Sequence, residues 1–159
     1  MKFFRMGASR EGGGMRKFGI VILCVVFFAM PALAEGNEAG SVKNAEGGAY
    51  IIRDGQEMSA EPGMRVFEKD MIRTDSDGSM GVILRDDTVL SFGPGTEVEL
   101  ATFLFNPIDE DYGLYLRMFK GTASFLSGSI GHLSPESVQV ETPDAVLGLK
   151  GTHFLIEVR

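Results

Sequence analysis

The two histidines are the first residues of this 159-residue chain to consider for catalysis or metal binding. Twenty residues lie between His132 and His153, so the two lack the short spacing that brings two imidazoles to one metal ion. His153 alternates with apolar residues in THFLIEV, so we expect an ordinary strand residue. A triad of Ser127 or Ser134 with His132 and Asp144 has no support, because the chain lacks a Gly-x-Ser-x-Gly turn.

Two acidic clusters resemble cation sites only in part. Residues 75–78 (DSDG) begin like an EF-hand loop, but the glycine comes too early and Asp86 stands at position twelve. We therefore favour a hairpin turn there. Residues 109–111 (DED) suggest either a weak cation site or a solvated loop, and we favour the solvated loop.

No sequence signal indicates paired carboxylates for glycoside hydrolysis. Residues 148–152 contain the Gly, Lys and Thr of a phosphate loop, but in the wrong order.

The sequence therefore predicts no catalytic residue, no metal and no cofactor, and we predict that the protein is not an enzyme.

The N-terminal segment has the three parts of a secretory signal peptide. Residues 1–17 contain five Lys and Arg against one acid, residues 18–30 are apolar, and an Ala-Leu-Ala site ends at Ala34. The apolar run has 13 residues, whereas a helix needs about 20 to cross a bilayer. We predict a helical signal peptide over residues 1–34, cleaved after Ala34, and a periplasmic or secreted protein. Met15 begins a complete signal by itself, and we hypothesise that it is the true start.

The composition of the processed chain excludes several classes of function. Residues 35–159 contain ten Lys and Arg against 21 Asp and Glu, hence a charge of −11, which argues against a nucleic-acid partner. The one cysteine, Cys24, lies in the signal peptide, so disulfides and thiol chemistry are excluded. Leu23 before it disfavours lipidation, because lipidated cysteines follow a small side chain. A hydrophobic content of 44% is too high for a disordered chain, and the length suits one domain.

Beyond a polar spacer at residues 35–40, short apolar runs alternate with turn signals. The runs are SVKNA, AYIIR, DMIRT, SMGVILR, TVLSF, TEVELATFLF, GLYLRMFKG, TASFLSG, SVQVET, AVLGLKG and THFLIEVR. Turn signals such as Asp54-Gly55 and Asp77-Gly78 predict hairpins, since glycine accepts a positive φ. Met80, Val82 and Leu84 alternate along one face. This pattern predicts an all-β fold, a single small rolled β-sheet or solenoid-like domain over residues 41–159.

Three blocks, in their order and spacing, together resemble the FecR family of bacterial envelope domains. Residues 68–74 (EKDMIRT) are similar to the family's Gly-Asp-x-Ile-Arg-Thr-Gly, residues 84–88 and 93–96 are similar to its Asp-Gly-Thr turn and Gly-Pro-x-Ser, and residues 142–154 are similar to its closing Thr-Pro-x-Ala and Gly-x-Arg-Gly-Thr-x-Phe. Residues 120–128 fit the intervening strand pair. The resemblance covers roughly residues 40–159. Lys69, Asp75 and Asp87 replace glycines of the family pattern, and Lys150 replaces an arginine.

The matching motif residues are Asp70, Arg73, Thr74, Asp86, Thr88, Gly93, Gly121, Thr142, Pro143, Gly148, Lys150, Gly151 and Thr152. We expect them to be structural, because carboxylates and hydroxyls at strand ends cap free backbone N–H groups. Aspartate tolerates the left-handed region, so Asp75 and Asp87 are compatible with their turns. If Lys150 pairs with a carboxylate, the pair lacks the planar fork of arginine.

The resemblance implies an exported β-roll that binds a protein partner in the envelope. Founding members of the family resemble a three-part regulator that receives a signal from an outer-membrane iron–siderophore transducer. This chain shows the periplasmic-type domain alone, so we do not expect it to control a sigma factor directly, and we expect no membrane span in the processed chain. The alternative is a structural or surface-assembly component without a signalling role.

We expect strand-edge pairing as the binding mode, because an open β-roll leaves unpaired backbone groups at its ends. Phe103, Leu104 and Phe105 form an apolar run whose alternation should turn at least one ring outward. They are a candidate contact patch, and burial under the loop at residues 109–111 is an equally good interpretation.

Overall fold

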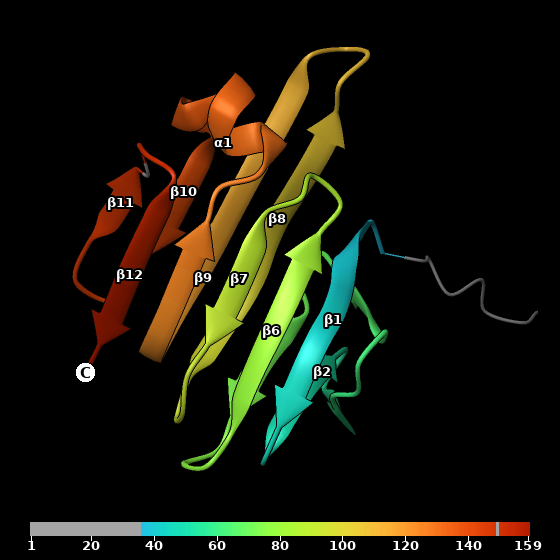
Figure 1. Ribbon diagram of the computed structural model, residues 1–159, viewed down its shortest axis with the longest axis vertical. Coiled ribbons are helices and arrows are strands. Elements are labelled where there is room, and N and C mark those ends of the chain that lie inside the picture. The colour runs from blue at the N-terminus through green and yellow to red at the C-terminus, as the bar shows by residue number, and fades with distance from the viewer. Residues whose placement is uncertain (1–35, 149) are drawn as a thin grey trace, which may run out of the picture. The chain divides into compact units, whose positions relative to one another are not determined.

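The structure is a computed structural model that describes residues 36–148 and 150–159, and in it these residues form an all-β domain (Figure 1), as predicted. The strands are β1 (Glu38–Glu46), β2 (Ala49–Arg53), β3 (Gln56–Ser59), β4 (Arg65–Phe67), β5 (Met71–Thr74), β6 (Ser79–Leu84), β7 (Val89–Phe92), β8 (Glu97–Asn106), β9 (Asp111–Leu126), β10 (Val138–Glu141), β11 (Val146–Gly148) and β12 (His153–Val158). Two short helical segments, α1 (Ser129–Leu133) and η1 (Pro135–Ser137), lie between β9 and β10.

The predicted signal peptide, its cleavage after Ala34 and the start at Met15 lie outside the described residues. The domain begins earlier than the sequence indicated. β1 starts at Glu38, inside the predicted spacer, because Ala39 and Gly40 are buried against the core.

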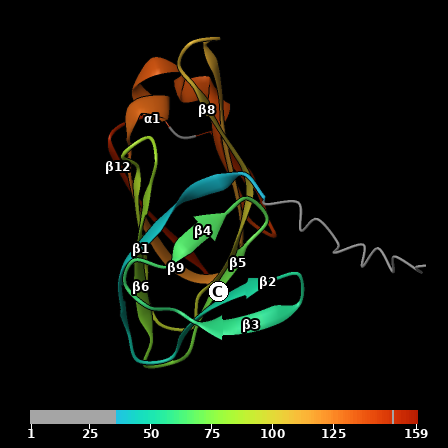
Figure 2. The same cartoon turned by 90° about the vertical axis from the view of Figure 1, so that its right-hand side faces the viewer.

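The strands form one 12-stranded sheet that curls into a half-barrel with two facing layers. The front layer has the order β4-β1-β6-β7-β9-β12, and the back layer has the order β3-β2-β5-β8-β9-β10-β11. All pairs are antiparallel except β9 with β10. Figure 2 shows the two layers from the side. Alternating apolar residues fill the space between them, including Met80, Val82 and Leu84, which the sequence placed on one face.

The long strand β9 belongs to both layers. Residues 111–120 pair with β8 in the back layer, whereas residues 121–126 pair with β7 and β12 in the front layer. The sequence suggested two separate strands here. They are continuous because Gly121, with φ of 95°, bends the chain from one layer into the other without interrupting the pairing.

The turns are of two kinds. Hairpins keep the chain within a layer, as at Asp54-Gly55, where φ values of 51° and 78° suit a two-residue hairpin. Crossing turns, at residues 47–48, 75–78 and 93–96, carry the chain from one layer to the other, as the bend at residues 120–121 does. The hairpin predicted at Asp77-Gly78 is therefore wrong, since β5 and β6 lie in different layers and do not pair. The dipeptide signals a turn but not whether the flanking strands become neighbours.

The two lateral ends of the half-barrel differ. At the closed end, residues 60–64 cross from β3 to β4 and donate hydrogen bonds to both layers, from Ala60 N–H to Ala49 O and from Gly63 N–H to Val42 O, each 2.8 Å. At the open end, β11 and β12 are the last strands of their layers and follow each other in the sequence. Of the residues between them, Gly151 and Thr152 accept hydrogen bonds from Ser127 just after β9, and among the described residues β11 and β12 do not pair with each other. Figure 1 shows β11 and β12 at the left margin of the sheet.

Candidate functional site

Threonines of the predicted motifs join successive crossing turns. Thr74 Oγ1 donates to the carbonyl oxygen of Gly93 (2.7 Å) and accepts the N–H of Thr96 (2.8 Å). Thr96 Oγ1 in turn accepts the N–H of Thr122 (3.0 Å) and lies 2.8 Å from Gly93 O. Thr74 and Thr96 are buried, so these bonds replace water for groups that would otherwise be unsatisfied. The motif therefore aligns the turns that set the spacing of the two layers.

Gly93 and Gly121 lie where these turns come too close for a side chain. A Cβ atom at Gly121 would overlap the backbone of Thr96, and a Cβ atom at Gly93 would overlap the hydroxyl of Thr122. Glycine is required at both positions by this close approach, and at Gly121 also by the positive φ.

Asp86 and Thr88 form a buried cap at the β6–β7 hairpin. Asp86 Oδ2 accepts the hydroxyl of Thr88 (2.7 Å) and the N–H of Ile130 (3.1 Å), while Thr88 Oγ1 accepts the N–H of Gly128 (3.1 Å). Asp87 has φ of 67°, a left-handed conformation that aspartate tolerates. The cap ties α1 to the front layer and so fixes the path of the chain towards β10.

Asp70 forms the main ion pair of the closed end. It is fully buried and accepts hydrogen bonds from Nε and Nη2 of Arg53, each at 2.7 Å, and from the N–H of Phe67 at 2.8 Å. The hydrogen bond to Asp70 is the main cause that raises the pKa of Arg53, and the guanidinium also lies 4.3 Å from the ring centroid of Phe67. Arg53 is outside the motif blocks, and its partner could not be inferred from spacing alone.

Arg73 follows Asp70 closely in the sequence but points to the outer face of the back layer. Its guanidinium lies 2.6 Å from Glu57 and 4.9 Å from the ring centroid of Tyr50. The structure therefore separates two charged residues of the same motif, one in the interior and one on the surface.

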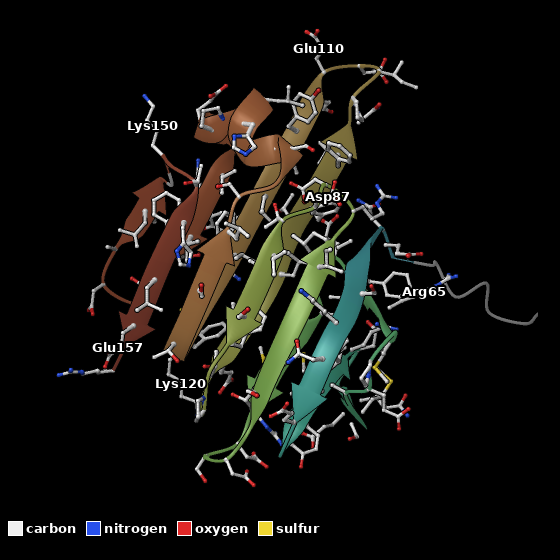
Figure 3. The ribbon with its side chains drawn as sticks, viewed as in Figure 1. Arg65, Asp87, Glu110, Lys120, Lys150 and Glu157 are labelled. Carbon is white, nitrogen blue, oxygen red and sulfur yellow. The ribbon has the colours of Figure 1, made fainter. Side chains whose placement is uncertain are left out.

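The third motif block lies at the open end. Thr142 forms the β10–β11 turn through its hydroxyl, which lies 3.1 Å from both the N–H and the carbonyl oxygen of Ala145. Gly148 ends β11, and Lys150 projects into solvent (Figure 3). The remaining residues are Pro143, exposed in the turn, and Gly151 and Thr152, whose carbonyl oxygens accept bonds from Ser127.

The predicted contact patch at Phe103, Leu104 and Phe105 needs a correction. Phe103 is 0% exposed, so it belongs to the core and is not available to a partner. It faces inward because it pairs with the buried Leu114 on β9. Phe105 packs against Tyr112 with ring centroids 6.1 Å apart, which leaves it half-buried, as Leu104 is.

A polar cluster on the outer face holds β10 against the back layer. Glu141 Oε2 accepts the hydroxyl of Tyr115 (2.6 Å) and Nε of Arg117 (2.8 Å), while Arg117 also pairs with Glu99 (2.9 Å). These bonds, first from Tyr115 and then from Arg117, lower the pKa of Glu141. The bond to Glu141 likewise raises the pKa of Tyr115. The cluster adds side-chain bonds to the pairing of the four-residue β10 with β9.

The open end exposes apolar side chains on its two edge strands. Val146 and Leu147 on β11 are 60% and 38% exposed, and Leu155 on β12 is 77% exposed. Leu147 pairs with the buried Val140, so it lies on the core-facing side of the back layer. A groove of about 470 Å³ separates Leu147 from Ile156 and Val158 of β12. The layers therefore end in a partly apolar groove.

No catalytic or metal centre accompanies this groove in the described part of the chain. Residues 36–148 and 150–159 contain no group of three or more potential metal ligands. Ser124 Oγ lies 2.9 Å from Nε2 of His153, but among the described residues no carboxylate hydrogen-bonds that imidazole, so the pair is a surface contact. At the other acidic cluster, Asp109 accepts the side-chain amide of Asn106 (2.7 Å) within its own loop.

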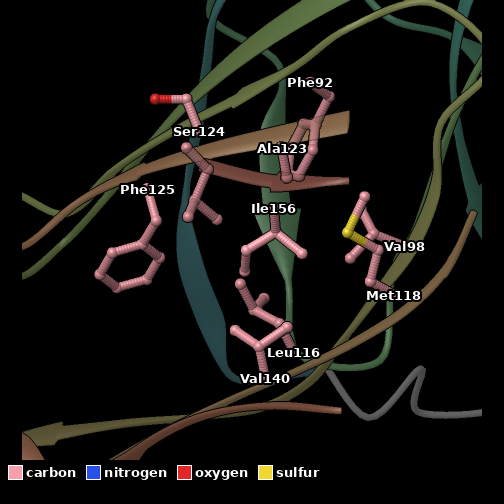
Figure 4. A pocket seen from close by; sticks show the side chains of 10 residues that line it. Phe92, Val98, Leu116, Met118, Ala123, Ser124, Phe125, Val140 and Ile156 are labelled. Atoms are coloured by element: carbon pink, nitrogen blue, oxygen red, sulfur yellow. The ribbon is translucent and has the colours of Figure 1, made fainter. Parts of the chain in front are cut away.

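The cavity between the layers is also too small to bind a ligand. It has a volume of about 10 Å³ and is lined mainly by apolar side chains, including Leu116, Val140 and Ile156 (Figure 4). An apolar space of this size remains dry. Among the described residues, no helix is long and apolar enough to span a membrane.

These features define an all-β domain whose two layers end in unpaired strand edges at β11 and β12. Comparison with protein-family models matches FecR protein over residues 70–159, more than half of the chain. The chain therefore belongs to the FecR family, which is associated with signalling and regulation at the bacterial envelope. Comparisons with curated proteins and with solved structures found no match.

Proposed function

We propose that this protein is an exported, non-enzymatic binding module of the bacterial envelope. It takes part in FecR-type signalling or regulation by binding a protein partner at its open end. Family membership supports the signalling role, and the predicted signal peptide supports export.

The observation that carries the proposal is the uncovered core-facing side of β11. Leu147 points towards the front layer, but that layer already ends at β12. A strand added beside β12 would cover Leu147 and pair with the free backbone groups of β12. Main-chain bonds would supply affinity and alternate side chains would supply specificity, as in other strand-addition complexes.

The composition of the edges supports the same conclusion. Natural sheets protect free edges with charges, proline or bulges. At the closed end, the edge strand of the back layer, β3, carries Gln56 and Glu57, and the edge strand of the front layer, β4, begins with Arg65. By contrast, β12 presents Leu155 at its centre. The edge at the open end is therefore the less protected of the two.

The closed end weighs against the alternative of a head-to-tail surface polymer. Such a polymer requires complementary surfaces at both ends of each subunit. Residues 60–64 cross the closed end, where Arg53 and Asp70 are already paired. One available end suits a binding module better than a repeating unit.

The experiment that tests the proposal is site-specific photo-crosslinking in cells. A photoreactive residue replaces Leu155 in one variant and Ile108, which is 92% exposed in the β8–β9 hairpin, in the control. We expect a protein adduct from position 155 and none from position 108. An outer-membrane receptor or membrane-bound regulator in the adduct supports signalling. Equal adducts from both positions, or surface polymers alone, would contradict the proposal.

A further inference from the structure

The two layers of the half-barrel differ by one strand at the open end. Beyond β9, the back layer adds β10 and β11, whereas the front layer adds β12 alone. β12 lies opposite β10, since Ile156 and Val140 line the same internal cavity. β11 therefore extends past the front layer, and the open end has the profile of a step.

The directions of the strands on this step are opposite. β10 is parallel to the first half of β9, and β11 is antiparallel to β10. β12 is antiparallel to the second half of β9, which runs back after the bend at Gly121. β11 and β12 therefore run in opposite directions, as their arrows in Figure 1 show.

We propose that the partner at the open end is a second copy of this chain, related by a twofold axis parallel to the strands. This inference rests on the proposed function, since it names the occupant of the same edge. The rotation exchanges front and back layers and preserves strand direction. β11 of each copy then fills the missing position beside β12 of the other, and the two pair in antiparallel fashion.

This arrangement fits the step better than a symmetric pairing of β12 with itself. The axis for that pairing is perpendicular to the sheet, and it keeps each layer in its own plane. The protruding β11 of one copy would then occupy the same position as β10 of the other copy in the back layer, and the two strands would clash. With the axis along the strands, the long layer of each copy meets the short layer of its partner, and both layers become continuous.

The side chains on the step suit this contact. The core-facing Leu147 of each copy is covered by the added strand, and the outward-facing Val146 lies on the same surface as Leu155 of the partner strand. These are three of the seven large apolar side chains that are exposed among the described residues. Their mutual burial supplies the hydrophobic contribution that strand pairing alone lacks.

The charges are also compatible with self-association. The predicted processed chain has a charge of −11, so two copies repel each other in general. β11 has no charged residue, and Glu157 on β12 is paired with Arg159 at 2.9 Å. Asp144 precedes β11 at the end of the groove that Arg159 also lines, so each copy brings a carboxylate near the other's guanidinium.

The first test is the molar mass of the processed full chain by light scattering coupled to gel filtration. We expect the mass of two chains for the unsubstituted protein and of one chain for Leu155→Asp. The control Ile108→Asp changes an apolar residue that is even more exposed than Leu155 and lies away from the step, and it should remain a dimer. Thermal melts of all three establish that each is folded. A single-chain mass for the unsubstituted protein at every concentration overturns the inference.

The second test distinguishes the twofold axes. The processed chain is predicted to lack cysteine, so Val146→Cys and Leu155→Cys introduce single thiols. We expect an intermolecular disulfide when the two variants are mixed and oxidised, and much less from either variant alone, because a disulfide requires adjacent strands. Glu157→Cys, on the same face of β12, repeats the experiment two residues further along the strand. Efficient crosslinking of Leu155→Cys with itself overturns the proposed axis.

The outcomes also separate this inference from the proposed function. A monomer whose position 155 still crosslinks to an envelope protein overturns the second copy as partner and leaves the binding module standing. A monomer without any adduct specific to position 155 overturns both.

Discussion

The closed and open ends of the half-barrel are built from the same kind of strands but finish the sheet in different ways. At the closed end a segment crosses between the layers, and the buried Asp70 is fully satisfied by Arg53 and Phe67. At the open end the layers are of unequal width, and Val146, Leu147 and Leu155 are exposed to solvent.

The buried hydrogen bonds that stabilise the fold lie at one end of the half-barrel, and the edge that we propose for binding lies at the other. A residue that is buried and multiply hydrogen-bonded can be replaced only at a cost in folding free energy. An exposed edge residue can be replaced in the monomer with little change in folding free energy, so its substitution should affect mainly the binding of a partner.

The largest effect is expected at the closed end. Asp70→Ala leaves Arg53 and the N–H of Phe67 without their acceptor. Loss of one partner of a buried pair costs roughly 3–5 kcal/mol of unfolding free energy. Because the Arg53 side chain is 33% exposed, we expect the lower end of that range, roughly 3 kcal/mol. Chemical denaturation measures the change. Glu61→Ala, an exposed carboxylate in the crossing segment, is the matched control and should be neutral. Equal stability of the two variants would contradict the structural role of the ion pair.

A smaller loss is expected where α1 joins the front layer. Asp86→Ala removes the acceptor of the Thr88 hydroxyl and of the Ile130 N–H, and unsatisfied buried donors cost about 1–3 kcal/mol. Asp87→Asn is the control, since asparagine also accepts the left-handed conformation and the Asp87 side chain is exposed. Hydrogen exchange should localise the loss to residues 128–134. If Asp86→Ala melts at the same temperature as the Asp87→Asn control, Asp86 does not stabilise the fold in this way.

The closed end should also permit a gain in stability. Lys69 has φ of 72° in the position where the family pattern has glycine, and this conformation costs roughly 1 kcal/mol for a residue with a Cβ atom. Lys69→Gly should therefore raise the melting temperature slightly. Lys69→Ala removes the same charge but keeps the Cβ atom, so it should bring no gain. The prediction fails if alanine and glycine behave alike.

At the open end, acid should weaken the attachment of β10. The folded protein lowers the pKa of Glu141, so its carboxylate stabilises the fold above the ordinary glutamate pKa. That contribution is lost as the pH falls through the lowered value. Melting temperatures between neutral pH and about pH 3 should decline less steeply for Glu141→Gln than for the unsubstituted protein. Glu61→Gln, which is exposed, should leave the slope unchanged.

The smallest effect on folding is expected at the edge itself. Leu155 is 77% exposed, so Leu155→Ser should change the unfolding free energy of the monomer by no more than about 0.5 kcal/mol. Denaturation under dilute conditions measures it. A loss comparable with that of Asp86→Ala would mean that β12 contributes to the core and would erase the contrast between the two ends.

The fold class was predictable because alternation of apolar residues reflects burial directly. The alternation of His153, Leu155 and Glu157 with inward-facing neighbours agrees with the observed burial of β12. What could not be predicted is which strands become neighbours. Asp77-Gly78 looks like a hairpin in sequence, yet its strands belong to different layers, since turn type depends on packing far from the dipeptide.

The candidate site shows the same limit. The resemblance pointed to Asp70, but its partner Arg53 lies 17 residues away outside the motif, at a distance that only the tertiary fold closes. Phe103 looked like part of a contact surface because three apolar residues in a row do not reveal which one faces inward. The step between β11 and β12 left no sequence signal, because it depends on the number of strands in each layer.

The bend in β9 has a consequence for how the domain folds. Residues 111–126 supply a strand to both layers, so neither layer can be completed before this segment is in place. Folds dominated by such distant pairings form slowly, and their unpaired strands stay exposed in the meantime. The chain emerges N-terminus first, and we expect it to remain a substrate for chaperones while only the strands up to β8 have emerged. Folding then proceeds only when the chain has passed Gly121.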